Sequence, residues 1–87
     1  MLKKEDGRLY LEEGHEVVAE LIYNNHEEYY DVTSTYTKPS HRNRGLAKDL
    51  VDEVVEMARE EGKKVQPTCP YVSYAIRDSK YDDIKIK

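Results

Sequence analysis

Residues 37–62 read TKPSHRNRGLAKDLVDEVVEMAREEG and contain the clearest structural pattern of the chain. After Gly45, apolar residues recur at the spacing of one helix face, at Leu46, Leu50, Val54 and Met57. Charged residues occupy most positions between them, which is typical of an amphipathic surface helix. Gly62 suits the left-handed residue that commonly closes a helix. The pattern predicts a helix of about five turns from Gly45 to Gly62.

Three β-strands are predicted before this helix. Arg8–Glu13 and Val17–Asn24 alternate apolar with polar residues, as half-buried strands do. Tyr29–Thr37 is rich in Tyr, Thr and Val, which favour strands. Because short turns separate the three strands, we expect them to form an antiparallel meander.

One further strand and a short helix are predicted after the long helix. Val65 begins the strand, and Pro67 and Pro70 limit its pairing because proline has no N–H to donate. Residues 71–83 are compatible with a short helix. For the tail, residues 84–87, we make no prediction. The fold class is therefore α/β (α+β), a small and mostly antiparallel sheet with one long helix and a short C-terminal helix.

The size and composition describe one small domain, residues 1–87. With 38% hydrophobic and 37% charged residues, the chain is expected to be a globular protein with a thin core. The net charge of −4 argues against nucleic-acid binding, and no apolar run approaches the roughly 18 residues of a membrane span. A single cysteine, Cys69, and a start without an apolar signal segment favour a cytoplasmic location. No set of His, Cys or Asp has metal-ligand spacing, so we expect no metal.

The loop before the long helix is basic although the chain is acidic. Five basic or potentially basic side chains surround Gly45, namely those of Lys38, His41, Arg42, Arg44 and Lys48. The first N–H groups of a helix have no intrahelical partner, and the helix dipole is positive at that end. We expect a first turn without acidic residues, and an anion site in which Gly45 lets the ligand approach the backbone. The alternative is a solvated basic loop with an ordinary turn glycine.

The segment TKPSHRNRGLA resembles the pyrophosphate-binding segment of the GNAT-type N-acetyltransferase family, whose pattern is Gln/Arg-x-x-Gly-x-Gly/Ala. The three motif positions are filled by Arg42, Gly45 and Ala47. Pro39 fills the usual lead-in, while Asn43 replaces a frequent extra glycine and Thr37 a common aliphatic residue. The following MAREEGKKVQPTCPYV is similar to a branch of small single-domain members. The resemblance implies a small GNAT-like, acyl-CoA-binding domain.

The same resemblance implies where acetyl-CoA binds. The strand before the loop pairs its backbone with the pantetheine arm, and the helix entrance holds the pyrophosphate. The next strand separates from that strand and leaves room for the thioester. Transferred by position, the cofactor-binding residues are Thr35, Tyr36, Thr37, Arg42, Asn43, Arg44, Gly45, Leu46, Ala47 and Lys48.

Cys69 and Tyr74 are the candidate catalytic residues. Cys69 lies near the end of the next strand, directly before the last predicted helix, and helix N-termini lower the pKa of cysteine. It is expected either to accept the acetyl group or to be a small buried apolar residue. Tyr71 and Tyr74 follow, and the resemblance implies that Tyr74 protonates the leaving CoA thiolate. The alternative for Tyr74 is a core side chain with its hydroxyl outward.

The leading hypothesis is an N-acetyltransferase that moves the acetyl group of acetyl-CoA to an unidentified amine, directly or through Cys69. Helices that wall the acceptor pocket in larger family members are not predicted here. We therefore expect either that the acceptor is a protein, which brings its own surface, or that a partner subunit completes the pocket. The chain itself is expected to be a monomer or a weak homodimer. The alternatives are a non-catalytic acyl-CoA binding or sensor module and a small nucleic-acid-binding domain.

Overall fold

The computed structural model describes residues 1–86, with nine elements in chain order. They are β1 (Leu2–Glu5), β2 (Arg8–Glu13), β3 (Glu16–Asn25), β4 (Tyr29–Thr37), the 3-10 turn η1 (Pro39–His41), α1 (Leu46–Glu61), β5 (Lys64–Pro67), α2 (Pro70–Ala75) and the 3-10 turn η2 (Ser79–Tyr81).

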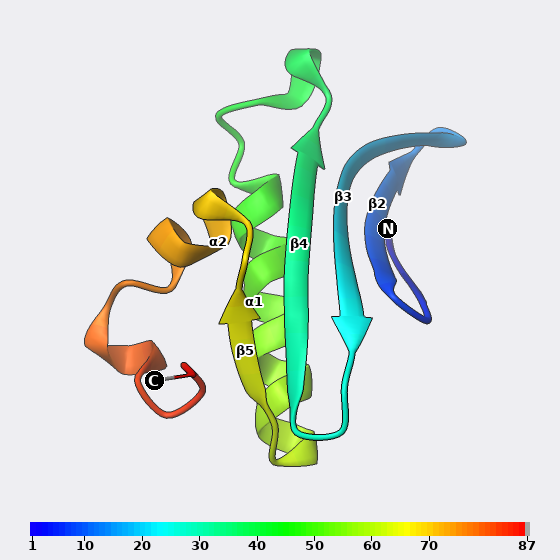
Figure 1. Ribbon diagram of the computed structural model, residues 1–87. Helices are drawn as coiled ribbons and strands as arrows, with labels where there is room; N and C mark the ends of the chain where they lie inside the picture. Colours follow the sequence, from blue (N-terminus) through cyan, green and yellow to red (C-terminus); the bar gives the residue numbers. More distant parts are fainter. Residues whose placement is uncertain (87) are drawn as a thin grey trace.

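Within residues 1–86, five strands form one sheet in the order β1-β2-β3-β4-β5. The first four pair antiparallel, and β5 pairs parallel to β4. Two parallel neighbours need a crossover connection, and α1 supplies it by running behind the sheet (Figure 1). The expected fold class, a mostly antiparallel sheet with one long and one short helix, is confirmed.

Local patterns located most of the strands. Arg8–Glu13 and Tyr29–Thr37 match their predicted bounds, and the second predicted strand is one residue longer at each end, Glu16–Asn25. The strand Leu2–Glu5 was not predicted, because its sequence LKKE has no alternating apolar pattern. This strand forms because it pairs with β2. The terminal ammonium of Met1 adds a hydrogen bond to the Glu12 carbonyl at 2.8 Å.

The C-terminal segment is less helical than predicted. α2 ends at Ala75, and the 3-10 turn η2 follows after Asp78, whose carboxylate accepts from the Lys80 N–H at 2.9 Å. The tail then returns to the sheet edge, where Lys85 forms a parallel bridge with Val65. Lys87, the last residue of the tail and of the predicted domain, lies outside the described residues.

The core lies between α1 and the sheet. The buried residues of α1 are Leu50, Val51, Val54, Val55 and Ala58. Of the face that the spacing predicts, Leu50 and Val54 are buried, whereas Leu46 and Met57 are partly buried. The buried residues pack against alternate strand residues, including Leu9, Leu21, Tyr30 and Val32. Tyr30 is 1% exposed, and its hydroxyl bonds the Glu61 carboxylate at the end of α1. A buried aromatic ring with a satisfied polar end suits a core that is rich in tyrosine.

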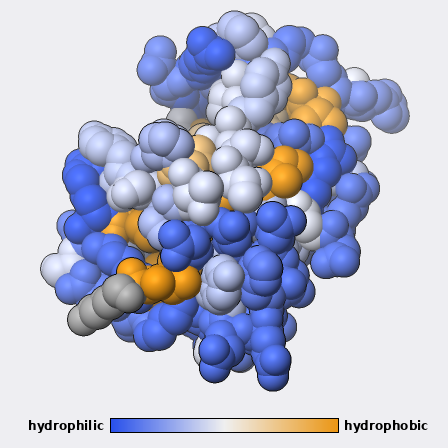
Figure 2. All heavy atoms as spheres, viewed as in Figure 1, coloured by the Kyte–Doolittle hydropathy of each residue, from blue (hydrophilic) through white to orange (hydrophobic). Residues whose placement is uncertain are grey.

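The opposite face of the sheet is covered by no element of residues 1–86. Because side chains alternate along a strand, Arg8, Tyr10 and Glu20 lie on this face when Leu9 and Leu21 lie in the core. Arg8 donates to Glu20 at 2.6 Å and stacks on Tyr10. The surface seen from the direction of Figure 1 is mostly hydrophilic, with scattered hydrophobic side chains (Figure 2). None of the described helices has the length and apolar character of a membrane span.

Val54→Ala should lower the free energy of unfolding by about 2 kcal/mol, because Val54 is 0% exposed and the neighbouring core cannot fill the gap. Urea unfolding followed by circular dichroism measures this. Glu60→Ala is the matched helix control, because Glu60 is exposed, and it should change stability by less than about 0.5 kcal/mol. Equal losses in the two variants would contradict the assigned core.

Candidate functional site

The candidate site begins where β5 leaves β4. The parallel pairing runs from Tyr29 opposite Lys64 to Val32 opposite Pro67, and β4 then continues to Thr37. Beyond Pro67, the Cys69 N–H donates to the Val32 carbonyl at 2.9 Å, and the chain turns into α2. The last residues of β4 are therefore not paired with β5, as the separation of the two strands predicts.

Thr35 and Thr37 present their backbone to this unpaired edge. The Thr35 N–H helps to lower the pKa of the Cys69 thiol, and the Thr37 carbonyl accepts from Arg42 Nε at 3.4 Å. Backbone groups of successive strand residues point to opposite edges, so those of Tyr36 point to β3, where Tyr36 lies opposite Glu20. The geometry thus favours two of the three predicted pantetheine contacts, Thr35 and Thr37.

The loop after β4 brings unpaired backbone N–H groups to the same end of the sheet. Asn43 and Gly45 have φ values of 67° and 74°, the left-handed region that Asn and Gly tolerate best. Gly45 is the N-cap of α1 and has no side-chain cap. Among residues 1–86, no carbonyl accepts from the N–H groups of residues 43–48. The helix entrance therefore offers a set of free donors.

A pocket of about 340 Å³ opens beside this entrance. It is lined by Thr37, His41, Arg42, Asn43, Gly45, Leu46, Ala47 and Tyr71. The end of β4, the loop and the first turn of α1 thus meet α2 at one cavity. Most of the predicted pyrophosphate residues line it.

Most of the basic side chains of the loop are neutralised within the protein. Glu13, at the end of β2, lies 3.1 Å from His41 Nε2 and 3.2 Å from Arg44. The hydrogen bond with His41, together with the charge of Arg44, lowers the pKa of Glu13. Lys38 pairs with Glu16. The sequence did not point to Glu13, because its partners lie 28 and 31 residues away in the chain.

The expected first turn without acidic residues is wrong. α1 begins at Leu46 rather than Gly45, so Asp49 lies in the first turn. Lys48 is also paired, since its ammonium bonds the Asp52 carboxylate at 2.8 Å and the Tyr81 hydroxyl at 2.6 Å. Within residues 1–86, Arg42 is the basic side chain of this loop that has no carboxylate within 4 Å. Backbone N–H groups therefore outnumber free positive charges at the pocket.

Cys69 is buried next to the unpaired edge of β4, with 7% of its surface exposed. Its sulfur lies 3.6 Å from the Thr35 hydroxyl. Burial raises the pKa of the Cys69 thiol, but hydrogen bonds from the Val72 N–H, the Thr35 hydroxyl and further backbone N–H groups outweigh it, so the pKa is lowered overall. The hydrogen-bond donors around the sulfur stabilise the thiolate, as a nucleophile that accepts the acetyl group would need. The burial of the side chain also agrees with the alternative, a small buried apolar residue.

Tyr71 lies nearer to the pocket than Tyr74. Tyr71 lines it, and burial raises the pKa of its phenol, which keeps the group protonated at neutral pH. Tyr74 is 61% exposed, and Arg77 stacks on its ring at 3.8 Å. The acid role predicted for Tyr74 stays a prediction, and of the two tyrosines it is Tyr71 that lines the cavity.

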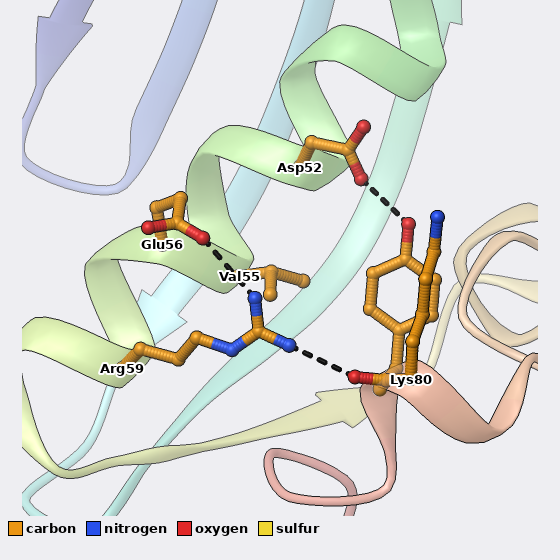
Figure 3. Close-up of a pocket in the computed structure, with 6 residues that line it drawn as sticks. Asp52, Val55, Glu56, Arg59 and Lys80 are labelled. Carbon is orange, nitrogen blue, oxygen red and sulfur yellow. Dashed lines mark hydrogen bonds and ion pairs between the residues drawn. The ribbon is translucent and has the colours of Figure 1, made fainter.

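A second cavity, of about 350 Å³, lies between α1 and η2. Asp52, Glu56 and Arg59 project into it from α1 (Figure 3). Arg59 donates to Glu56 at 3.1 Å and to the Lys80 carbonyl at 2.9 Å, so the polar groups here bind one another. We regard it as the junction that fixes η2 on α1. No group of three or more His, Cys, Asp or Glu side chains in residues 1–86 is arranged to hold a metal ion.

The fold and the cavity at the head of α1 define a GNAT-type architecture. Residues 8–84 match a family model described as GCN5-related N-acetyltransferase. The chain therefore belongs to the GCN5-related N-acetyltransferase family. A comparison with curated protein sequences gives no match.

Solved structures share the fold. A GCN5-like candidate N-acetyltransferase from Staphylococcus aureus has a TM-score of 0.76 at 21% identity, with 99% of this chain and 87% of that one covered. Ribosomal-protein-alanine N-acetyltransferase from Brucella melitensis biovar Abortus 2308 gives 0.66 at 22% identity, with 92% and 58% covered. A predicted acetyltransferase from Clostridium acetobutylicum, solved with acetyl-CoA, gives 0.57 at 20% identity, with 77% and 53% covered. This chain thus spans little more than half of the last two proteins.

Thr35→Val should raise the pKa of the Cys69 thiol, because it removes the hydroxyl that stabilises the thiolate and keeps the shape of the side chain. The pH dependence of Cys69 alkylation by iodoacetamide measures this, with the midpoint expected at higher pH in the variant. Thr33→Val is the control, because the Thr33 hydroxyl donates to the Ile22 carbonyl instead. The same midpoint in wild type and Thr35→Val would contradict the assigned contact.

Proposed function

We propose that this chain is a single-domain N-acetyltransferase that binds acetyl-CoA and transfers its acetyl group to an amine. One observation carries the proposal. The N–H groups of residues 43–48 have no carbonyl partner in the described chain, and they open onto a cavity that continues from the unpaired edge of β4. A ligand with phosphates at one end and an amide-bearing arm at the other satisfies both sets of backbone groups.

The backbone donors fit a pyrophosphate. Backbone N–H groups at a helix entrance bind phosphate oxygens, and the helix dipole adds positive potential there. Gly45 has no Cβ, and a Cβ built at this position meets no atom within 4 Å, so the space above it is open to a ligand. Arg42, whose guanidinium has no carboxylate partner within residues 1–86, adds a charge-assisted contact.

The unpaired edge of β4 fits the pantetheine arm and the thioester. The Thr35 and Thr37 backbone groups supply donors and acceptors at the spacing of a β-strand, which an amide-bearing arm can match. Of these groups, the Thr35 N–H is the donor proposed to polarise the thioester carbonyl, and the others are left for the arm. The neutral acceptor amine then attacks the carbonyl carbon, the C–S bond breaks, the CoA sulfur takes one proton and the new amide nitrogen releases one, so the proton count balances. Tyr71 lines the cavity and is protonated at neutral pH, so we propose it as the donor, with Tyr74 as the alternative.

Cys69 offers a second route. Its sulfur lies beside Thr35, where the thioester carbonyl is proposed to bind. In this route the thiolate attacks the carbonyl, CoA leaves as the thiol, and the acetyl-cysteine passes the group to the amine. The acceptor is proposed to reach the site over the sheet face that no described element covers, which leaves room for a protein substrate.

Gly45→Ala should weaken acetyl-CoA binding by about tenfold or more, because the added methyl group stands between the ligand and the free N–H groups. Isothermal titration calorimetry measures the affinity. Gly62→Ala is the matched control, because Gly62 caps the other end of α1 with φ 68° against 74° for Gly45, and neither position has an atom within 4 Å of a built Cβ. Both variants carry the same backbone strain, so similar stability with unchanged affinity in Gly45→Ala would refute the pyrophosphate site.

Incubation with acetyl-CoA should add one acetyl group at Cys69 if the two-step route operates. Intact-protein mass spectrometry and peptide mapping detect the adduct, and candidate amines added afterwards should remove it. Cys69→Ala should then lose the adduct and the transfer. If the wild type forms no adduct and Cys69→Ala keeps its activity, direct transfer is the route. Binding of acetyl-CoA without an adduct and without transfer to any amine would instead favour the acyl-CoA sensor.

A further inference from the structure

A third cavity adjoins the candidate site on the far side of the first turn of α1. It has a volume of about 260 Å³ and is lined by Lys48, Ala75, Arg77, Asp78, Lys80 and Tyr81. Lys48 follows Ala47, which lines the pyrophosphate cavity, and Ala75 lies on the same short helix as Tyr71. The two cavities are therefore neighbours along the contact between α1 and α2.

Two cations in this third cavity have no carboxylate partner. Neither Arg77 nor Lys80 forms an ion pair within residues 1–86, whereas Lys48 is held by Asp52. Arg77 stacks on Tyr74 and donates one N–H to the Tyr74 carbonyl at 2.8 Å, which leaves its other N–H groups free. Lys80 lies over the Tyr81 ring, with its ammonium 5.2 Å from the ring centre.

Asp78 is the acidic side chain of this cavity, and its carboxylate is already used. It accepts from the Lys80 N–H at 2.9 Å and caps η2. Although Asp78 lines the same cavity, neither the Arg77 guanidinium nor the Lys80 ammonium forms an ion pair with a carboxylate within residues 1–86. Their chemistry matches a phosphate, because a guanidinium binds two oxygens at once and an ammonium adds a point charge.

CoA carries a further phosphate that can reach this cavity if its pyrophosphate lies at Gly45. Its pyrophosphate is attached to C5′ of a ribose, and a third phosphate is attached to C3′ of the same ribose. If the pantetheine arm runs toward β4 from the N–H groups of residues 43–48, the ribose must extend the other way. Lys48 is three residues past Gly45, roughly 5 Å along the helix axis, which is within the span of one ribose.

We propose that Arg77 and Lys80 bind the 3′-phosphate of coenzyme A and make the chain selective for CoA over its 3′-dephospho form. This inference rests on the proposed function, because it takes the pyrophosphate to lie at Gly45. It assigns the C-terminal segment a role in choosing the acyl donor, in addition to covering α1.

The test compares CoA with 3′-dephospho-CoA by isothermal titration calorimetry. Wild type should bind CoA about tenfold more tightly than 3′-dephospho-CoA, the effect of one or two charge-assisted hydrogen bonds. Arg77→Gln combined with Lys80→Gln should remove this preference by weakening CoA about tenfold, while the affinity for 3′-dephospho-CoA changes less than about twofold. Lys3→Gln, at the distant β1, is the charge control and should leave the preference intact.

The other outcomes separate the two proposals. Equal binding of both ligands by wild type would overturn the 3′-phosphate subsite and leave acetyl-CoA binding standing. Equal weakening of both ligands in the double variant would also overturn it, since the residues would not be reading the 3′-phosphate. If wild type binds neither ligand, the proposed function fails and this inference fails with it. Circular dichroism of each variant verifies that it is folded.

Discussion

The arrangement of the whole candidate site depends on the point at which β5 leaves β4. Pro67 ends the parallel pairing opposite Val32, and the Cys69 N–H then takes the last β4 carbonyl on that edge that is within its reach. Had β5 continued in register, its backbone would have paired with Thr35 and closed the edge. Proline at positions 67 and 70 disfavours this, since neither can donate an N–H to the ladder. The free half of β4 is thus a consequence of backbone chemistry.

The same constraint explains how an acidic chain can hold an anion site. β4 leads through residues 38–45 into α1, so the unpaired strand edge and the unpaired helix N–H groups lie at one end of the sheet. The basic side chains there are mostly taken by acids, with Glu13 binding both His41 and Arg44. The N–H groups of residues 43–48, in contrast, donate to none of these carboxylates in the described chain and stay available as donors. Phosphate recognition by the backbone is therefore compatible with a net charge of −4.

What the sequence predicts well is local. The periodicity of α1, the alternation of β2 and the composition of β4 act through near neighbours, so these elements appear close to their predicted bounds. β1 depends on pairing with β2, and the Glu13 contacts cross 28 and 31 residues, so no local pattern carries them. The first turn of α1 was wrongly expected to lack acidic residues, because Gly45 is the cap of the helix rather than its first residue and Asp49 therefore lies in the first turn. The loop motif was enough to locate the candidate site. The ion pairs of its basic side chains could be assigned only from the folded structure.

The contact between Thr35 and Cys69 is where the two proposed routes diverge. In the described structure the Cys69 sulfur lies 3.6 Å from the Thr35 hydroxyl, and the Thr35 N–H, which is the donor proposed to polarise the thioester carbonyl, helps to lower the pKa of the thiol. Direct transfer requires this N–H to exchange the sulfur for the carbonyl oxygen, so Cys69 would act as its resting partner. The two-step route instead requires the thioester carbonyl carbon to lie beside the Cys69 sulfur, with neighbouring N–H groups binding the developing oxyanion. Burial at 7% exposure shields the thiol from solvent in both cases, so the partner of the Thr35 N–H decides between the routes.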